Sequence, residues 1–187
     1  AKDLRAFRNR CHFAIALSEL CQKMDIGTAC SRLSECAENG LQFVVDYLLA
    51  SSTASADTEI ASARWVILGL GKLGAGELNY SSDIDVIVLQ QFAPNSSEES
   101  YDKQSRHFIG LTRRLAKILS EDTRDGFGWR VDFRLRPDPA ATPLSLSYAA
   151  AVSYYESTAR SWERAAFIRA RPVAGDIALG QQYNIVR

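Results

Sequence analysis

The sequence lacks several features that would assign it at once to a class of protein. Only two histidines occur among 187 residues, and 22 Lys and Arg residues balance 22 Asp and Glu residues. No apolar run reaches the 18 or more residues of a membrane-spanning helix, and no signal peptide is recognisable. Without net positive charge, the chain has no general attraction to nucleic acid or acidic membranes. We therefore expect partners other than nucleic acid or membrane.

Cysteine is confined to the first forty residues, and its spacing fits no common metal site. There is no Cys-x-x-Cys pair, and a chain of this length can fold without disulfides. We expect free thiols at all four positions, Cys11, Cys21, Cys30 and Cys36. Free thiols indicate a cytoplasmic protein. His12 and His107 are isolated and are assigned no chemistry. The start at Ala1 and the single methionine favour a segment of a longer protein.

Hydrophobic periodicity predicts N-terminal helices followed by an α+β core. Apolar residues recur at helical spacing over 2–24 and 28–49, so residues 1–50 are expected to form a helical segment. Small polar residues over 51–63 indicate a linker, and 64–187 form the predicted core. The strands predicted in that core are 65–68, 84–89 and 128–136. The predicted helices are 103–121 and, as one or two helices, 147–169.

Residues 69–90, GLGKLGAGELNYSSDIDVIVLQ, combine a glycine-rich loop with two acids at the start of a buried strand. The opening GLGKLG matches the dinucleotide fingerprint, but only 15 residues separate Leu68 from Ile84. That is too few for a crossover helix of normal length, and the second strand ends in glutamine rather than in a ribose-binding acid. A P-loop is excluded as well, because leucine follows Lys72 where Ser or Thr is required.

The two acids at the strand start, Asp83 and Asp85, are one residue apart. Alternate residues of a strand point to the same face, so both carboxylates project together, roughly 6.7 Å apart along the chain. Such a pair can bridge divalent ions held roughly 3.5–4 Å apart. Without a cation, the two like charges would raise each other's pKa, so the pair favours a metal site. A helix cap or a solvated strand end is the alternative.

A third acid, Asp132, lies in the segment WRVDFRLR, where apolar and polar residues alternate strictly. The alternation predicts that Arg130, Asp132, Arg134 and Arg136 share one strand face. An acid flanked by arginines suits a metal ligand beside a polyphosphate, although an exposed, salt-bridged face is the alternative. Together with the glycine loop and the first two acids, Asp132 is typical of two-metal nucleotidyl transfer.

Three motifs, in order, resemble one protein family. GLGKLGAGELNYSSDIDVIVL, GFGWRVDFRLRPDP and YYESTARSWERAAFIRARPVAGD are similar to the glutamate–ammonia ligase (glutamine synthetase) adenylyltransferase family, within the DNA-polymerase-β-type nucleotidyltransferase superfamily. The resemblance is close over 64–176 and looser over the N-terminal helices. It implies a polymerase-β-like α+β core, a small mixed sheet with flanking helices, preceded by N-terminal helices.

Proteins of this family carry two such domains, one that removes AMP from a tyrosine of glutamine synthetase and one that adds it. The form NYSSDID with RVDFRLRP is more similar to the removing half, because the other half tends to carry an acid before Val-Asp. The resemblance therefore implies phosphorolysis, in which inorganic phosphate attacks the adenylyl group and releases it from the tyrosine as ADP. This reaction would regulate nitrogen assimilation. The resemblance also implies glutamine synthetase as a partner and, through the full-length enzyme, the PII signalling protein.

Residue roles follow from the same resemblance. The ligands implied for Mg²⁺, with Mn²⁺ as a substitute, are Asp83, Asp85 and Asp132. Contacts to ADP or ATP and phosphate are implied for Gly69, Gly71, Lys72, Gly74, Ser82, Arg134 and Arg136. For Ser81 and Ser82 a turn role is an equal alternative. In the third motif we expect Trp162 to pack in the core and Glu163 and Arg164 to form an ion pair.

Two other functions stay open. The chain could be the half that adds AMP from ATP, since both halves share the fold and the acids. It could also be a catalytically silent nucleotide-binding module that signals to the missing half. The intact set of three acids argues against the silent module, because such a domain is free to lose one of them.

Overall fold

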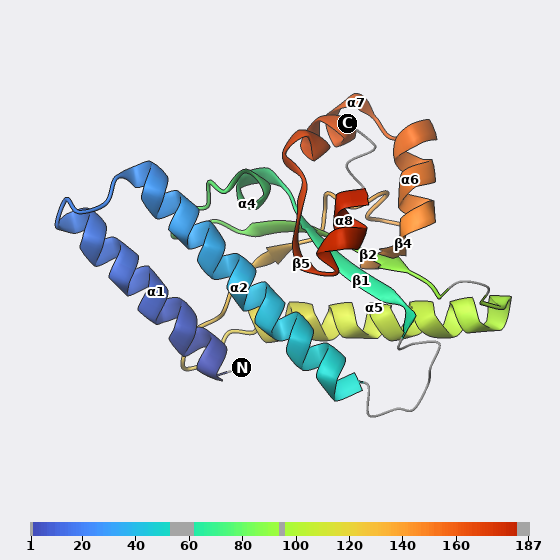
Figure 1. Cartoon of the computed structure of the whole chain (residues 1–187), viewed down its shortest axis with the longest axis horizontal. Helices are drawn as coiled ribbons and strands as arrows, with labels where there is room; N and C mark the ends of the chain where they lie inside the picture. Colours follow the sequence, from blue (N-terminus) through green and yellow to red (C-terminus); the bar gives the residue numbers. More distant parts are fainter. Residues whose placement is uncertain (1, 53–61, 94–95, 183–187) are drawn as a thin grey trace.

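The computed structural model describes residues 2–52, 62–93 and 96–182. Two long helices, α1 (Lys2–Leu20) and α2 (Ile26–Ser52), form an N-terminal hairpin in the sequence order predicted. Most of the predicted linker over 51–63 lies outside the described residues. In Figure 1 the hairpin lies to one side of the sheet, and α2 runs from the α1–α2 turn towards β1.

The sheet is small and mixed, which confirms the predicted α+β class. β1 (Arg64–Gly69) pairs in antiparallel fashion with β2 (Ile84–Gln91) and, on its other side, with β5 (Arg171–Gly175). β2 pairs in parallel with β3 (Val131–Asp132) near its start and with β4 (Ser145–Ser147) near its end. The strand order is β3-β2-β1-β5, with β4 also beside β2. Antiparallel β1 and β2 are incompatible with a dinucleotide-binding βαβ unit, as the short spacing indicated.

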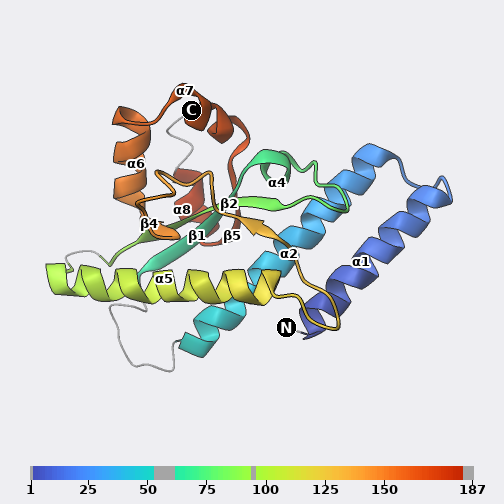
Figure 2. The same ribbon diagram turned by 180° about the vertical axis from the view of Figure 1, so that it is seen from behind.

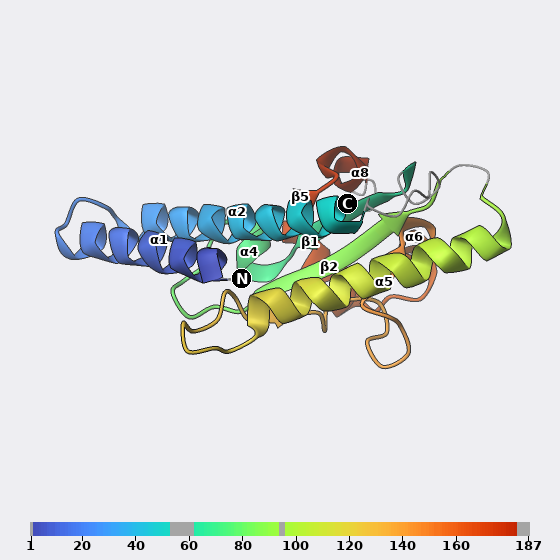
Figure 3. The ribbon, with the colours of Figure 1, turned by 90° about the horizontal axis from the view of Figure 1, so that it is seen from below.

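The two faces of the sheet are covered by different helices. Alternate strand residues Trp65, Ile67, Val86 and Val88 share one hydrophobic cluster with α1, α2 and α5 (Glu98–Ser120). Their neighbours in the same strands pack in a second cluster with α6 (Tyr148–Ser157), α7 (Ser161–Ala166) and α8 (Ile177–Gln182). Seen from behind, α5 crosses the sheet on the side opposite α6 and α7 (Figure 2). From below, β1 and β2 are visible between α2 and α5 (Figure 3).

The second face is covered by short elements. These are α6 (Tyr148–Ser157), α7 (Ser161–Ala166), a 3₁₀ turn η1 (Phe167–Arg169) and α8 (Ile177–Gln182). The prediction of one or two helices over 147–169 is thus confirmed in its essentials, while β4, β5 and α8 were not predicted.

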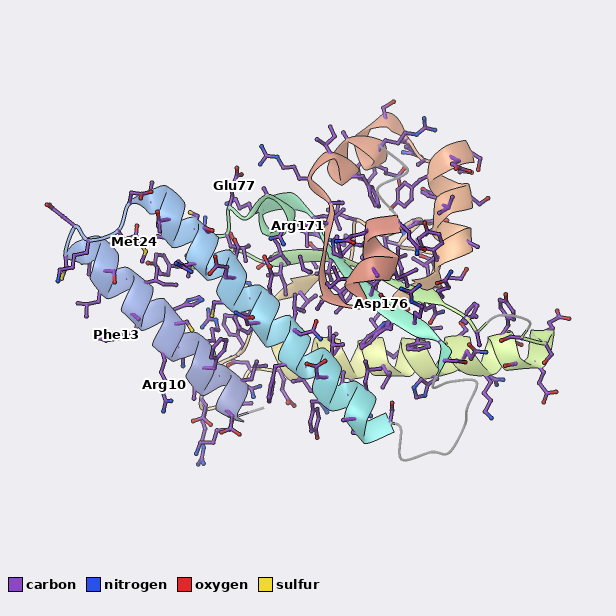
Figure 4. All side chains as sticks on the ribbon, viewed as in Figure 1. Arg10, Phe13, Met24, Glu77, Arg171 and Asp176 are labelled. Atoms are coloured by element: carbon purple, nitrogen blue, oxygen red, sulfur yellow. The ribbon has the colours of Figure 1, made fainter. Side chains whose placement is uncertain are left out.

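A five-residue helix, α4 (Gly71–Ala75), follows β1 directly. Arg171 of β5 fixes it by donating from Nε to the Gly74 carbonyl at 3.0 Å. The same guanidinium pairs with Glu38 of α2. Arg171 lies between α4 and α8 in Figure 4. One side chain thus connects the glycine-rich segment, the sheet and the N-terminal hairpin.

The predicted strand over 128–136 is wrong in length, because only Val131 and Asp132 pair with β2. After Phe133 the chain turns, and Arg136 donates to the Phe133 carbonyl across that turn at 2.9 Å. Arg134 and Arg136 therefore do not continue a strand face. The four cysteines are free thiols, as expected. Among the described residues, no helix is both long enough and apolar enough to cross a membrane.

Candidate active site

The parallel pairing of β2 with β3 brings two of the three predicted acids side by side. Asp85 is the register partner of Asp132, and the Ile84 amide donates to the Arg130 carbonyl at 2.9 Å. Residues in register on neighbouring strands project to the same face of a sheet. By alternation, that face is the one covered by α6, α7 and α8, because Ile87 belongs to their cluster. The short β3 therefore suffices to place Asp132 beside Asp85.

Asp85 is half-buried and lies against the glycine loop. A Cβ on Gly71 would overlap the Asp85 Oδ2 atom, and Gly71 has φ +51°, a left-handed conformation that glycine adopts readily. The Leu70 amide also donates to the Asp85 carbonyl at 2.9 Å. Gly71 thus gives the carboxylate room at the junction of β1 and α4.

The ionisation of Asp85 responds to both other acids. Burial raises the pKa of Asp85, and the negative charges of Asp132 and then Asp83 raise it further. The positive charge of Arg134 acts in the opposite direction on the same pKa. The three carboxylates are therefore close enough to interact electrostatically, and a cation among them would relieve that repulsion.

Arg134 holds the Asp132 carboxylate as a fork. Its Nε lies 2.7 Å from Oδ2, its Nη2 lies 2.5 Å from the same oxygen, and its backbone amide donates to Oδ1 at 2.7 Å. These hydrogen bonds lower the pKa of Asp132. The Arg134 side chain itself is 84% exposed, whereas the Asp132 side chain is only 14% exposed. The turn after β3, rather than a continued strand, brings Arg134 to Asp132.

Arg130 holds the first acid in a similar way. Its Nε donates to Asp83 Oδ1 at 2.5 Å, and its Nη2 donates to the Ser81 carbonyl at 2.6 Å. The sequence predicted that Arg130 lies near Asp132, but it did not predict this contact to Asp83. The available signal was its position two residues before Asp132, which puts it beside the start of β2.

The donor set suits a hard cation, but the arginines occupy part of it. Three carboxylates supply the oxygen ligands that Mg²⁺ prefers. Within the described part of the chain, no three Asp, Glu, His or Cys side chains are arranged to hold a metal ion. Two of the three carboxylates are instead turned onto Arg130 and Arg134. A metal ion could use these ligands if the two guanidinium groups gave way.

The remaining predicted contacts are dispersed around this cluster. Gly69 and Gly74 are packed closely, and a Cβ on Gly74 would lie 2.6 Å from the Gly69 carbonyl oxygen. Lys72 is exposed on α4. The Ser82 hydroxyl donates to Asn79 Oδ1 at 2.8 Å, which is the turn role considered as an alternative. Arg136 donates to the Pro139 carbonyl at 2.7 Å and so holds the proline-rich loop.

The third motif differs from expectation at two positions. Trp162 is 55% exposed, so the prediction that it packs in the core is wrong. Glu163 is buried, but it accepts from the Tyr154 hydroxyl at 2.7 Å and from the Arg160 amide at 2.8 Å. Glu163 therefore caps α7. The expected ion pair between Glu163 and Arg164 does not occur among the described residues.

Known proteins match nearly all of this chain. The family described as glutamate–ammonia ligase adenylyltransferase matches residues 1–185. The chain is 43% identical over 188 residues to the bifunctional glutamine synthetase adenylyltransferase/adenylyl-removing enzyme of Rhizobium meliloti, covering 96% of this chain and 19% of that protein. Proteins of the same name from Agrobacterium fabrum and Brucella suis are 41% and 42% identical, with the same coverage. The chain thus spans about 19% of the length of these curated relatives.

Proposed function

The chain belongs to the glutamate–ammonia ligase adenylyltransferase family, and we propose that it removes AMP from an adenylylated tyrosine of glutamine synthetase by metal-dependent phosphorolysis. The observation that carries this proposal is the register pairing of Asp85 with Asp132, with Asp83 close enough to raise the pKa of Asp85. Three interacting acids can supply oxygen ligands to divalent cations, and a pair of such ions can stabilise both the attacking and the leaving oxygen of an in-line displacement.

In the proposed site, Asp83, Asp85 and Asp132 hold Mg²⁺, and Mn²⁺ can replace it. The bound ions supply charge neutralisation on the phosphates and align the attacking and leaving oxygens. Asp85 is already positioned by Gly71 and the β2–β3 pairing. With these carboxylates holding a cation, Arg130 and Arg134 would be available to phosphate oxygens, which their planar guanidinium forks match.

The proposed reaction needs one displacement at phosphorus. An oxygen of inorganic phosphate attacks the adenylyl phosphorus, and the bond from that phosphorus to the tyrosine oxygen breaks. The tyrosine oxygen takes up a proton, and the products are ADP and unmodified glutamine synthetase. Basic groups beside the reacting phosphates stabilise the charge that builds up in the transition state. Lys72 and Arg134 are the exposed cations that we assign to this role.

The removing direction is favoured by the residues around the acids. The segments NYSSDID and RVDFRLRP resemble the adenylyl-removing half, and they place Arg130 where the adding half tends to carry an acid. Arg130 contacts Asp83 directly, so this difference lies within the site. The relatives are named for acting on glutamine synthetase, which we propose as the substrate of this domain. The PII protein, acting through the full-length enzyme, and a cytoplasmic location are parts of the same proposal.

A direct assay tests this function. The chain is incubated with adenylylated glutamine synthetase, Mg²⁺ and phosphate, and ADP is measured by anion-exchange chromatography. We expect ADP that requires phosphate, disappears with EDTA and returns with excess Mg²⁺. Unmodified glutamine synthetase with ATP is the matched control. Incorporation of AMP in that control without any ADP in the first reaction would assign the chain to the adding half instead.

A further inference from the structure

A polar cavity lies on the α1 side of the loop that precedes β2. It has a volume of about 60 Å³. One water molecule needs about 10–15 Å³ of such space, so the cavity has room for a small tetrahedral anion. Its polar lining includes Arg8 and His12 of α1, Tyr80 and Ser81 of the loop, and Arg130. No Asp or Glu occurs in the lining as described.

Two guanidinium groups line the cavity, whereas no carboxylate lies in its lining as described. The guanidinium carbons of Arg8 and Arg130 lie 5.1 and 5.6 Å from the centre of the Phe127 ring, so both side chains meet at one aromatic residue. Burial lowers the pKa of Arg8, Cys36 acts in the opposite direction, and the charge of Arg130 lowers that pKa further. Asp83, which does not line the cavity, accepts from Arg130.

His12 responds to the same positive potential. Its pKa is lowered to about 4, first by burial and then by the charge of Arg8. The ring is therefore neutral at pH 7, and it packs edge-on against Tyr80 at 5.8 Å. Glu19, which is not among the lining residues, accepts from the Tyr80 hydroxyl at 2.5 Å.

Arg8 also has an unused donor. Its Nε is buried and has no hydrogen-bond partner within the described part of the chain, while Nη1 makes only a 3.3 Å contact to Asn9. An unpaired buried donor costs about 1–3 kcal/mol, and an acceptor that reached Nε after a small movement of the Arg8 side chain would recover that cost. An oxyanion can accept from such a donor and from a second guanidinium at the same time.

We propose that this cavity binds inorganic phosphate between Arg8 and Arg130, and that the bound anion draws Arg130 away from Asp83. Phosphate occupancy thereby frees the Asp83 carboxylate to bind a metal ion. The binding itself stands on the cavity alone, whereas the link to metal rests on the proposed function. Because coupling between two sites is reciprocal, phosphate strengthens metal binding and metal strengthens phosphate binding.

The first test measures phosphate binding without metal. The protein in EDTA is titrated calorimetrically with phosphate at an ionic strength held constant with chloride. Loss of one charged hydrogen-bond partner should weaken binding of phosphate to Arg8→Gln about tenfold or more. Arg8→Lys, which keeps the charge but loses the fork, should fall between Arg8→Gln and wild type. Arg10→Gln is the matched control, because Arg10 projects from α1 on the side away from α2 (Figure 4).

Unchanged affinity in Arg8→Gln would overturn the proposal. If that variant fails to fold, the NMR shifts of backbone amides in the wild-type protein on addition of phosphate test the proposal instead. The largest shifts should then occur at residues 79–82 and Arg130, and shifts centred elsewhere would contradict the site. An AMP titration separates the sources of the anion, because the small cavity excludes a nucleoside. Binding of AMP that is tighter than that of phosphate and depends on Arg8 would contradict assignment to inorganic phosphate.

The second test measures the coupling. Phosphate should lower the Mn²⁺ dissociation constant of the wild-type protein, as followed by electron paramagnetic resonance. Arg130→Gln should bind Mn²⁺ more tightly than wild type without phosphate and should show no further gain with it. Phosphate binding without this coupling would overturn the link to Asp83. Failure of ADP release with both binding effects present would instead overturn the proposed function.

Discussion

The Asp85 carboxylate has two neighbours of like charge and a glycine backbone against it. Burial and the charges of Asp132 and Asp83 raise its pKa, so ionising Asp85 costs the folded protein free energy when no cation is bound. Such a cost is typical of a side chain selected for binding or catalysis rather than for stability. The same geometry therefore predicts opposite effects of one substitution on activity and stability.

Asp85→Asn should abolish most activity without destabilising the fold. The substitution preserves size but removes the charge that binds metal, and metal stabilisation of the transition state is worth several kcal/mol, so ADP release should fall on the order of a thousandfold. Mn²⁺ binding should weaken in parallel. Asp102→Asn, at an exposed position in α5, is the control and should retain both. Near-wild-type turnover in Asp85→Asn would make Asp85 a structural residue.

The stability effect of Asp85→Asn should depend on pH. A carboxyl whose pKa is raised in the folded state favours folding below its unfolded pKa, and that contribution is lost as pH rises through the folded pKa. In EDTA at pH 7, where Asp85 is ionised, the variant should therefore melt above the wild type. The difference should shrink as pH falls below the ordinary carboxyl range. Equal melting temperatures at pH 7 would contradict the assigned repulsion.

Gly71→Ala should impair the site more than a similar change nearby. Alanine at φ +51° costs roughly 1–2 kcal/mol of stability, and its methyl group would displace the Asp85 carboxylate. A displacement of about 1 Å can reduce the rate of an enzyme roughly hundredfold. Gly76→Ala, at φ +72° with no atom within 4 Å of the new methyl, bears the backbone cost alone. Thermal melts and ADP release for both variants separate strain from displacement of Asp85.

Helix α2 approaches the strand region closely at one glycine. A Cβ on Gly40 would lie 2.6 Å from Cη2 of the buried Trp129 ring. Leu41, Val44 and other α2 residues share a hydrophobic cluster with strand residues such as Ile67. The N-terminal hairpin therefore packs directly on the sheet, next to the segment that leads into β3.

Gly40→Ala should reverse the usual effect of replacing a helical glycine. Alanine in a helix interior gains roughly 0.5–1 kcal/mol over glycine. At Gly40, overpacking against Trp129 should cost about 1–3 kcal/mol and lower the melting temperature. Gly110→Ala in α5 meets no atom within 4 Å and should raise it. If both variants shift in the same direction, the close approach of α2 to Trp129 is not a packing constraint.

Sequence patterns predicted the central elements well and the short ones poorly. β1 and β2 are continuous apolar runs buried on both faces, and their predicted ranges agree with the structure within two residues. β5 was missed because Pro172 argues against a strand, yet β5 is an edge strand, where proline is tolerated. β4 has only three residues and no apolar alternation to detect.

The candidate site was predictable in its acids but not in its ion pairs. Spacing predicted Asp83, Asp85 and Asp132 as the site acids, and the structure pairs Asp85 with Asp132 in register on one face. The contact of Arg130 with Asp83 depends on two loops meeting at the start of β2, which no local pattern encodes. Exposure of Trp162 likewise depends on how α7 packs, and a family-like motif does not determine that packing.

At the scale of the whole molecule, the fold places two charged sites on either side of one short loop. The acids lie at the start of β2 beside α4, and the Arg8 cavity lies between that loop and α1. Arg130 contacts both, through Asp83 and through the cavity wall. The N-terminal hairpin is thus part of the environment of the proposed active site.

Isotopic tracing of phosphate tests the central claim most directly. The chain is mixed with adenylylated glutamine synthetase, Mg²⁺ and phosphate labelled at phosphorus, and the nucleotide products are separated. Phosphorolysis predicts that the label appears in ADP, at its β-phosphate, and that unmodified glutamine synthetase accumulates in equal amount. Asp85→Asn should lose this transfer, while Asp102→Asn should keep it. Label that remains entirely in inorganic phosphate while glutamine synthetase stays adenylylated, or while AMP is released by water, would contradict the account.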